Sequence, residues 1–437
     1  MNREATEVRD AAAGYDFRAV EPAVPEGYKQ TEVGVIPEDW EVAQLGVISR
    51  VTSGKRLPAG YYVTEKETPY PYIRVSDMYQ GGVAVNDIRY VPAEAAQTIS
   101  QYRIFKEDIF ISVAGTLGLV GTIPEWLDGA NLTENANRIS DIGCDRDYLL
   151  YVLLSGHVQG VIESIRTVGA QPKLALTRIR KFQIPLPPAK EEQRAIATAL
   201  SDIDALMEEL NRLIAKKRDL KQAAMQQLLT GQTRLPGFEG EWGTKMLGEL
   251  GSFIKGSGVK RDDAQSGHIP CIRYGEIYTT HHDVVREFRS WISEEVALNA
   301  TRIQYGDLLF AGSGETKEDI GKCVALVSET EAYAGGDVVI LRPASVDPVF
   351  MGYALNLPEV NRQKSRFGQG DAVVHISASA LSNVTVKLPT LDEQATIANV
   401  LSDMDAEIDA MEQCRAKTAE LKQAMMQELL TGRTRLV

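Results

Sequence analysis

The clearest chemical pattern in this sequence is a basic stretch late in the first half of the chain. Between Arg166 and Lys181 there are five Lys or Arg side chains and no Asp or Glu. Positive side chains without acidic neighbours can neutralise phosphates. Gln171 lies within this stretch, and a glutamine side chain can hydrogen-bond the edge of an adenine. The stretch therefore predicts a nucleic-acid contact made by Gln171, Lys173, Arg178 and Arg180.

Further basic residues stand at corresponding places in the two halves of the chain, in segments that we expect to be loops. Lys55 and Arg56 follow Ser53-Gly54 in the first half. The second half carries a matching set, namely Lys255, Lys260 and Arg261, and later Arg366, Gln369 and His375. Any single residue of this kind is ordinarily a solvated surface charge. We therefore predict a nucleic-acid contact for these sets and assign no base to any one residue.

Some polar residues have two open interpretations. Arg74 and Arg273 each follow an isoleucine and correspond in the two halves, which fits either a nucleic-acid contact or a structural role. Arg138 and the preceding Asn135-Ala136-Asn137 could contact a nucleic acid but are equally typical of a turn. The run from Tyr278 to His282 could stack on bases or simply end an exposed strand.

Two patterns that suggest nucleotide chemistry fail on inspection. The segment from Gly314 to Cys323 resembles a phosphate-binding loop, but its glycines are wrongly spaced and cysteine replaces the required Ser or Thr. The chain also lacks the Asn/Asp-Pro-Pro-Tyr/Phe motif that an adenine methyltransferase would carry, and Asn356-Leu357-Pro358-Glu359 is not such a motif. Neither pattern predicts a catalytic or nucleotide-binding site.

A third pattern superficially fits an acidic nuclease site. It combines Asp307 with Glu315 and Lys317. Asp307 has a counterpart in the first half, Asp108, whereas Glu315 and Lys317 have none. A residue type that recurs without its supposed partners points away from catalysis. We therefore expect no catalytic residue in this chain.

Composition narrows the class of protein. The four cysteines form no CxxC and the five histidines form no HExxH, so the sequence predicts neither a disulfide framework nor a bound metal. No apolar run approaches the ~20 residues of a membrane span. The first residues lack the pattern of a signal peptide, so we expect a cytoplasmic location. The net charge of −13 is unusual for a nucleic-acid binder, so any such surface must be local or completed by a partner.

A cassette near the middle of the chain recurs at its end. The first copy begins at Glu192-Gln193 and closes with Thr233-Arg234-Leu235. The second copy begins at Glu393-Gln394 and closes with Thr434-Arg435-Leu436. Both ends keep an offset of 201 positions (394 − 193 and 436 − 235). Self-similarity at so long a period indicates two copies of a domain-sized unit.

The segments between the cassettes read as strand-rich domains. Short β-branched and aromatic runs alternate with Gly and Pro, a pattern that predicts strands. Trp40 corresponds to Trp242, and the similarity outside such framework positions is weak. We therefore predict an N-terminal arm at 1–27, two related domains at 28–187 and 236–389, and two helical segments at 188–235 and 390–437.

Each helical segment shows a broad apolar stripe and sorted charges. From Glu191 to Thr230 there is no Pro or Gly, so about 40 residues at 1.5 Å each predict a helix of roughly 60 Å, ended by a left-handed cap at Gly231. Acidic residues fill the first half of each helix and basic residues the second half. Antiparallel pairing puts opposite charges together, and a second copy within one chain supplies the partner. A coiled coil between two chains remains the alternative.

Together these residues resemble the specificity (S) subunit of type I restriction–modification systems. The resemblance covers nearly the whole chain beyond residue 27. It rests on the entry segment from Tyr28 to Trp40, and on Leu186-Pro187-Pro188 with the two cassettes, which look like the family's conserved helical regions. Gly169-Ala170-Gln171-Pro172-Lys173 also looks like a loop that recurs in this family. No single piece is specific, but the combination is.

The resemblance implies an α+β fold, in which two strand-rich α/β target-recognition domains are separated by two long antiparallel coiled-coil helices in a pseudo-twofold internal repeat. Each domain would read one half of a bipartite double-stranded DNA site. The helices would set the spacing and dock two methyltransferase (M) subunits, to which restriction (R) subunits join. We assign the docking to Leu200, Leu220, Leu229, Leu401, Leu421 and Leu430.

The family also implies where the cofactors act. The chain itself would hold none, since S-adenosylmethionine would be used by the M subunits, and ATP and Mg²⁺ by the R subunits. Two other functions compete with this one. A fused nuclease or methylase would need the motifs that the sequence lacks, and a coiled-coil adaptor would leave the duplicated domains with different loops unexplained.

Overall fold

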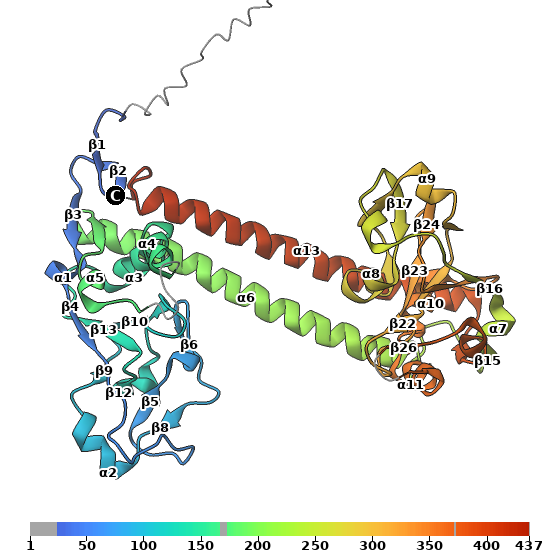
Figure 1. Ribbon diagram of the computed structural model, residues 1–437, viewed down its shortest axis with the longest axis horizontal. Coiled ribbons are helices and arrows are strands. Elements are labelled where there is room, and N and C mark those ends of the chain that lie inside the picture. The colour runs from blue at the N-terminus through green and yellow to red at the C-terminus, as the bar shows by residue number, and fades with distance from the viewer. Residues whose placement is uncertain (1–23, 167–172, 371–372, 437) are drawn as a thin grey trace, which may run out of the picture. The chain divides into compact units, whose positions relative to one another are not determined.

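The computed structural model describes residues 24–166, 173–370 and 373–436 (Figure 1). Backbone contacts divide the chain into two units. Unit 1 comprises Met1–Glu208 with Ala416–Val437, and unit 2 comprises Glu209–Arg415. Each unit therefore holds one strand-rich domain together with a segment of both long helices, α6 (Lys190–Leu228) and α13 (Leu391–Leu429).

Unit 1 contains two four-stranded sheets and three strand pairs. The first sheet has the order β11-β10-β13-β4 and is antiparallel; the second has the order β8-β5-β12-β9, with β5 and β12 parallel. The strands are β1 (Tyr28–Thr31), β2 (Gly34–Pro37), β3 (Glu41–Gln44), β4 (Arg50–Ser53), β5 (Pro71–Ile73), β6 (Met78–Tyr79), β7 (Gly82–Val83), β8 (Arg89–Tyr90), β9 (Arg103–Ile104), β10 (Ile109–Ser112), β11 (Val120–Gly121), β12 (Ala130–Leu132), β13 (Ala136–Ser140) and β14 (Gln183–Leu186). The α-helices are α1 (Leu45–Ile48), α2 (Ala93–Ala96), α3 (Arg146–Leu154), α4 (Gly156–Arg166) and α5 (Leu176–Ile179).

Unit 2 repeats the frame of two sheets, with five strands instead of four in its larger sheet. Its larger sheet has the order β16-β25-β21-β23-β18, and its smaller sheet β19-β17-β24-β20 again contains one parallel pair, β17 with β24. The strands are β15 (Gly243–Met246), β16 (Gly251–Lys255), β17 (Ile269–Ile272), β18 (Val284–Val285), β19 (Ser290–Ile292), β20 (Thr301–Ile303), β21 (Leu308–Ala311), β22 (Ser313–Gly314), β23 (Cys323–Leu326), β24 (Ala332–Ala334), β25 (Val338–Pro343), β26 (Val374–His375) and β27 (Thr385–Leu388). The α-helices are α7 (Leu247–Leu250), α8 (Tyr274–Thr279), α9 (Glu294–Ala297), α10 (Pro348–Ala354), α11 (Pro358–Phe367) and α12 (Ala378–Leu381).

The predicted long helices are confirmed, including their ends. Each has 39 residues. Gly231 and Gly432 follow the two helices with φ of 71° and 67°, the left-handed backbone that a residue without a side chain adopts most readily. The absence of Pro and Gly inside the helices allows them to continue unbroken across the division between the units.

The antiparallel pairing of the helices is visible within each unit. In unit 1, Asp204 of α6 is 2.6 Å from the Lys422 ammonium of α13. In unit 2, Asn211 of α6 meets Arg415 of α13, and Lys221, further along α6, meets Asp405, which comes earlier on α13. The intervening ion pairs are Lys217–Glu407 at 2.5 Å and Arg218–Glu412 at 2.6 Å. The sorted charges are thus paired as the sequence predicts, while buried apolar residues provide most of the stabilisation.

Gln193 and Gln394, at the start of the two cassettes, attach each long helix to the domain that precedes it. Gln193 accepts a hydrogen bond from the Asp145 backbone N–H at 2.8 Å and donates one to Pro187 O at 2.9 Å. Gln394 makes the same bonds with Asp347 N–H and Pro389 O, each at 3.0 Å. Asp145 and Asp347 are themselves the N-caps of α3 and α10.

The Glu residues of the cassettes form buried ion pairs with the opposite cassette. Glu192, 2% exposed, holds Arg435, whose Nε lies 2.5 Å from the Glu192 carboxylate. The Arg435 guanidinium also pairs with Asp39 at 2.9 Å and lies 5.7 Å from the ring centroid of Trp40. In unit 2, Glu393 pairs with Arg234 at 2.6 Å, and Arg234 lies 5.8 Å from the Trp242 ring.

Among the described residues, no single helix is both long and apolar enough to cross a bilayer. The consecutive helices Arg146–Leu154 and Gly156–Ile165, bent by 52°, meet the length and composition criteria only when they are taken together. Most residues of α3 are buried in the core of unit 1, which accounts for their apolar character.

The Glu192–Arg435 pair is expected to stabilise unit 1 strongly. Arg435→Met leaves the Glu192 charge buried without its partner, which costs about 3 kcal/mol. The matched control is Arg433→Met, because Arg433 is half exposed and lies 3.6 Å from its acidic neighbour Glu428; this change should cost under ~1 kcal/mol. Urea unfolding followed by tryptophan fluorescence measures both, and equal midpoints for the two variants would contradict the assignment.

Candidate nucleic-acid interface

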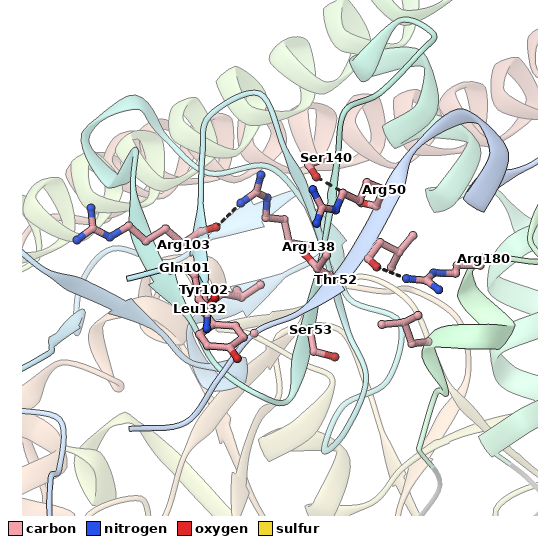
Figure 2. Close-up of a pocket in the computed structure, with 13 residues that line it drawn as sticks. Arg50, Thr52, Ser53, Gln101, Tyr102, Arg103, Leu132, Arg138, Ser140 and Arg180 are labelled. Carbon is pink, nitrogen blue, oxygen red and sulfur yellow. Dashed lines mark hydrogen bonds between the residues drawn. The ribbon is translucent and has the colours of Figure 1, made fainter. Parts of the chain in front are cut away.

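A basic groove of about 420 Å³ lies on the first sheet of unit 1. It is lined by strands β4 and β13 on one side and by helix α5 on the other. Figure 2 shows the guanidinium groups of Arg50 and Arg138 near the middle of the view, with Arg103 and Arg180 at its two sides. None of the residues that line the groove is acidic. This surface is therefore locally positive although the whole chain carries a net charge of −13.

Two of the groove arginines, Arg138 and Arg180, are held by backbone carbonyl oxygens. Arg138 donates to the carbonyl oxygen of Arg103 at 2.8 Å and pairs with the buried Asp108 carboxylate at 2.8 Å. Arg180 donates to the carbonyl oxygen of Val51 at 2.9 Å. Arg50 is exposed at the start of β4. Side chains fixed in this way lose little further freedom when they bind phosphate or a guanine edge.

The predicted site residues of the first half only partly converge on this groove. Arg180 lines it. Lys55 and Arg56 are exposed on the loop that follows β4, and the Lys55 ammonium lies 5.8 Å from the ring of Tyr102, which lines the groove. Lys173 and Arg178 are exposed but do not line it. Gln171 lies outside the described residues.

A glycine fixes the loop at the edge of each domain. A Cβ atom on Gly54 would lie 2.1 Å from the carbonyl oxygen of Thr133, and one on Gly256 would lie 2.1 Å from that of Gly335. Neither backbone contact could yield easily, so only glycine fits. Lys55 follows the first glycine and donates its backbone N–H to Leu132 of β12, whereas Lys255 precedes the second and pairs with Val339 of β25.

A second groove, of about 280 Å³, lies at the corresponding strand end in unit 2. It brings together three predicted residues that are far apart in the sequence, Lys255, Gln369 and His375. Gln369 and His375 exchange backbone hydrogen bonds of 2.9 and 2.8 Å, and His375 Nδ1 is 2.8 Å from the hydroxyl of Ser313. Lys260, Arg261 and Arg366 are exposed but do not line this groove.

Arg74 and Arg273 have internal partners. Arg74 makes two hydrogen bonds with Asp77, at 2.6 and 3.0 Å, and a further ion pair with Asp87 at 3.2 Å. Arg273 donates to Glu276 at 2.9 Å, in the same i to i+3 relation. These contacts support the structural interpretation of the pair. Arg138 lies inside strand β13, so the interpretation as a turn residue was wrong.

A cavity of about 890 Å³ lies in unit 2 beside the run from Tyr278 to His282. Lys322 lines it and donates to the carbonyl oxygens of Tyr278 and His281 at 3.4 and 3.1 Å. Burial lowers the pKa of Lys322 and raises the pKa of Tyr278 to about 12. The residues after Lys322 form strand β23, whereas a phosphate-binding loop would open a helix, so the rejection of that motif holds.

Four of the six leucines predicted to dock partners are core residues instead. Leu200 and Leu430 pack in the core of unit 1, and Leu229 and Leu401 in the core of unit 2. Each is at most 4% exposed, so their assignment to partner binding is corrected. Leu220 and Leu421 are 49% and 52% exposed and keep that prediction.

The comparison with protein families matches the chain twice, once in each half. The model of the type I restriction modification DNA specificity domain covers residues 37–217 and 239–423. The chain belongs to this family. Its two matched regions coincide with the two strand-rich domains and the long helix that follows each.

Individual specificity subunits are similar over nearly their full length. The putative MjaX specificity subunit of Methanocaldococcus jannaschii is 26% identical over 94% of this chain and 97% of its own. The EcoKI specificity subunit of Escherichia coli K12 is 22% identical over 91% and 90%. The crystal structure of a type I S subunit from M. genitalium shares the fold, with a TM-score of 0.55, 16% identity, and coverage of 89% of this chain and 96% of that one.

The sequence alone did not single out Arg50 or Arg103, and it left Arg138 open between a nucleic-acid contact and a turn. Arg50, Arg103 and Arg138 lie on three different strands, and only the pairing of β4 with β13 and the packing of the second sheet bring them together. Each is flanked by ordinary strand residues, so no local spacing marks it. Asp108 and its counterpart Asp307 each pair with an arginine at 2.8 Å, Arg138 and Arg342, but these arginines occupy different positions of the strand register and gave no signal.

For this specificity subunit we expect the exposed groove arginines to set the salt dependence of DNA binding. Arg50→Gln should reduce the slope of log affinity against log salt by about 0.9, because one phosphate contact is lost. The control, Arg74→Gln, removes the same charge from a guanidinium held by Asp77 and should leave the slope unchanged. Titration of duplex DNA with the assembled complex measures both, and equal slopes for the two variants would count against the groove.

Lys364 should give unit 2 a distinctive pH dependence. It is fully buried, donates to the carbonyl oxygens of Gly321 and Leu355, and has a pKa lowered by burial to about 8. Above pH 8 the folded state releases this proton while the unfolded state, with the ordinary pKa of 10.5, retains it. Stability therefore rises with pH in that window, by up to ~1.4 kcal/mol per unit.

The measurement is the difference in unfolding free energy between the wild type and Lys364→Met, followed from pH 7 to pH 9.5. Subtraction removes the contributions of the other titrating groups. The corresponding residue of unit 1 is the apolar Ile162, which packs on Gly118 as Lys364 packs on Gly321, so methionine is sterically reasonable. Parallel curves for the two proteins would show that Lys364 does not titrate in this range.

Proposed function

We propose that this chain is the DNA-recognition and scaffolding subunit of a type I restriction–modification complex. Each strand-rich domain would read one half of a bipartite double-stranded DNA site, and the chain itself would catalyse no reaction. The observation that carries the proposal is that the two domains share one frame but present different side chains in their grooves. Two domains with the same fold but different groove side chains suit a DNA site whose two half-sites differ in sequence.

The chemistry of the grooves supports reading rather than reaction. The unit 1 groove offers arginines, which bind phosphate and the O6 and N7 atoms of guanine. The unit 2 groove offers Lys255, Gln369 and His375 beside Asp337, and so combines charges of both signs with an amide and an imidazole. Asp108, which lies beside the first groove, is buried and paired with Arg138.

The proposed partners follow from the family. Two M subunits would dock on the long helices, where Leu206, Leu220 and Leu421 expose apolar surface. S-adenosylmethionine would act in the M subunits, and ATP with Mg²⁺ in the R subunits that join them. The acidic balance of the chain then suits a protein whose surface is largely covered by other subunits and whose DNA contacts are confined to two grooves.

The test is to co-express the chain with an M subunit gene from the same system and to map adenine methylation in the host DNA. We expect one bipartite methylated sequence. Replacing residues 236–389 with the equivalent domain of another specificity subunit should change one half of that sequence and leave the other half and the spacing intact.

Several outcomes would contradict the proposal. Methylation or cleavage by this chain without partners would favour a fused enzyme. Changes in both halves after the domain exchange would show that the two domains do not read separately. A complete absence of sequence-specific methylation, with the M subunit bound, would favour the adaptor interpretation.

A further inference from the structure

A tyrosine of the first domain is bound to both long helices in unit 1. Tyr151 of α3 is 5% exposed and donates to the Asp204 carboxylate of α6 at 2.9 Å. The Lys422 ammonium of α13 is 2.6 Å from the other oxygen of Asp204 and lies 5.7 Å from the Tyr151 ring centroid. Helix α3 of the domain and both long helices, α6 and α13, therefore meet at the Asp204 carboxylate.

The same three-residue arrangement recurs in unit 2 with the roles of the helices exchanged. Tyr353 of α10, fully buried, donates to Asp405 of α13 at 2.6 Å. Lys221 of α6 is 2.5 Å from Asp405 and 5.0 Å from the Tyr353 ring centroid. In unit 2 the Lys221 ammonium also lies 3.7 Å from Asp283, a domain residue held by Asn356.

Comparison of the two units distinguishes Tyr151 from Tyr148, which lies on the same helix. Tyr148 lies one turn earlier on α3 and donates to the carbonyl oxygen of Pro185, within the domain. Its counterpart in unit 2 is Phe350, which has no hydroxyl. The hydroxyl that stays inside the domain is thus dispensable to the shared frame, whereas the hydroxyl that reaches the long helices is present in both copies.

We propose that Tyr151–Asp204–Lys422 and Tyr353–Asp405–Lys221 are positioning residues that fix the orientation of each recognition domain on its segment of the helix pair. This inference rests on the proposed function, because the orientation of the domains sets which spacing between the DNA half-sites can be read. The residues touch no base. They act by holding the domains that do.

The geometry suits this role better than simple stabilisation. A hydrogen bond to a carboxylate is directional, and the second oxygen of that carboxylate is held by a lysine from the other helix. Rotation of the domain about the helix would break the tyrosine contact before it disturbed the apolar core, which is far less directional. Burial raises the pKa of Tyr151 and Tyr353, so each hydroxyl remains a donor throughout the physiological range.

The experiment compares three single-hydroxyl deletions in the complex formed with the M subunit: Tyr151→Phe, Tyr353→Phe and the matched control Tyr148→Phe. Genome-wide methylation is scored at the wild-type spacing and at otherwise identical sites that are one base pair shorter or longer. We expect preference for the correct spacing to fall about tenfold in Tyr151→Phe and in Tyr353→Phe, with the half-site sequences unchanged. Tyr148→Phe should keep the wild-type preference.

A second variant distinguishes the hydrogen bond from the charge. Asp204→Asn retains an acceptor for the tyrosine but removes the charge that faces Lys422, and it should lower the spacing preference by about threefold. Thermal unfolding of every variant is measured alongside. A loss of preference that followed stability, and so also appeared in Tyr148→Phe, would overturn the inference.

The remaining outcomes are also decisive. Unchanged spacing preference in Tyr151→Phe would overturn the positioning role. Loss of methylation at every spacing would overturn it too, because deletion of one hydroxyl should leave both half-sites readable. If the wild-type complex methylates no bipartite sequence, the proposed function itself fails, and this result is seen before any variant is compared.

Discussion

The buried ion pair between the glutamate of one cassette and the arginine of the other is the interaction on which each unit depends. Glu192 and Arg435 are far apart in the sequence, yet their contact joins the first turn of α6 to the segment after α13. A carboxylate removed from water is costly unless a cation accompanies it. Arg435 supplies this cation, and its guanidinium lies over the Trp40 ring, so the pair connects α6, the segment after α13 and the domain. The pair Glu393–Arg234 does the same in unit 2.

This dependence explains why the two copies of the chain differ where they do. Arg435, for example, is bound to both Glu192 and Asp39, so a change in any one of the three leaves a charge without its partner. The groove residues make few such contacts with other elements. Arg50 and Lys255, for example, lie at corresponding strands but contribute nothing to the cores. One frame can therefore carry two different surfaces without loss of stability.

The sequence predicted the long helices well because their signals are local. Apolar spacing, sorted charge and the glycine that follows each helix need no knowledge of the rest of the fold. The same apolar stripe misled the assignment of Leu200 and Leu401 to partners, because a stripe shows which face is buried but not by what. Both ends of each helix are covered by the chain's own domains, and of the six leucines predicted to bind a partner, Leu220 and Leu421 remain exposed.

The groove could not be predicted for a related reason. Its arginines come from strands that are distant in the sequence, and their meeting depends on sheet order and register, which single residues do not encode. Charge counting was equally misleading, since the net charge of −13 hides how the acids are used. Asp108 is engaged with Arg138, and Asp204 and Asp405 are engaged with lysines of the facing helix. Acidic residues that are paired with Lys or Arg in this way do not oppose the positive field of the groove as free surface carboxylates would. An acidic chain can therefore still present a positive surface to DNA.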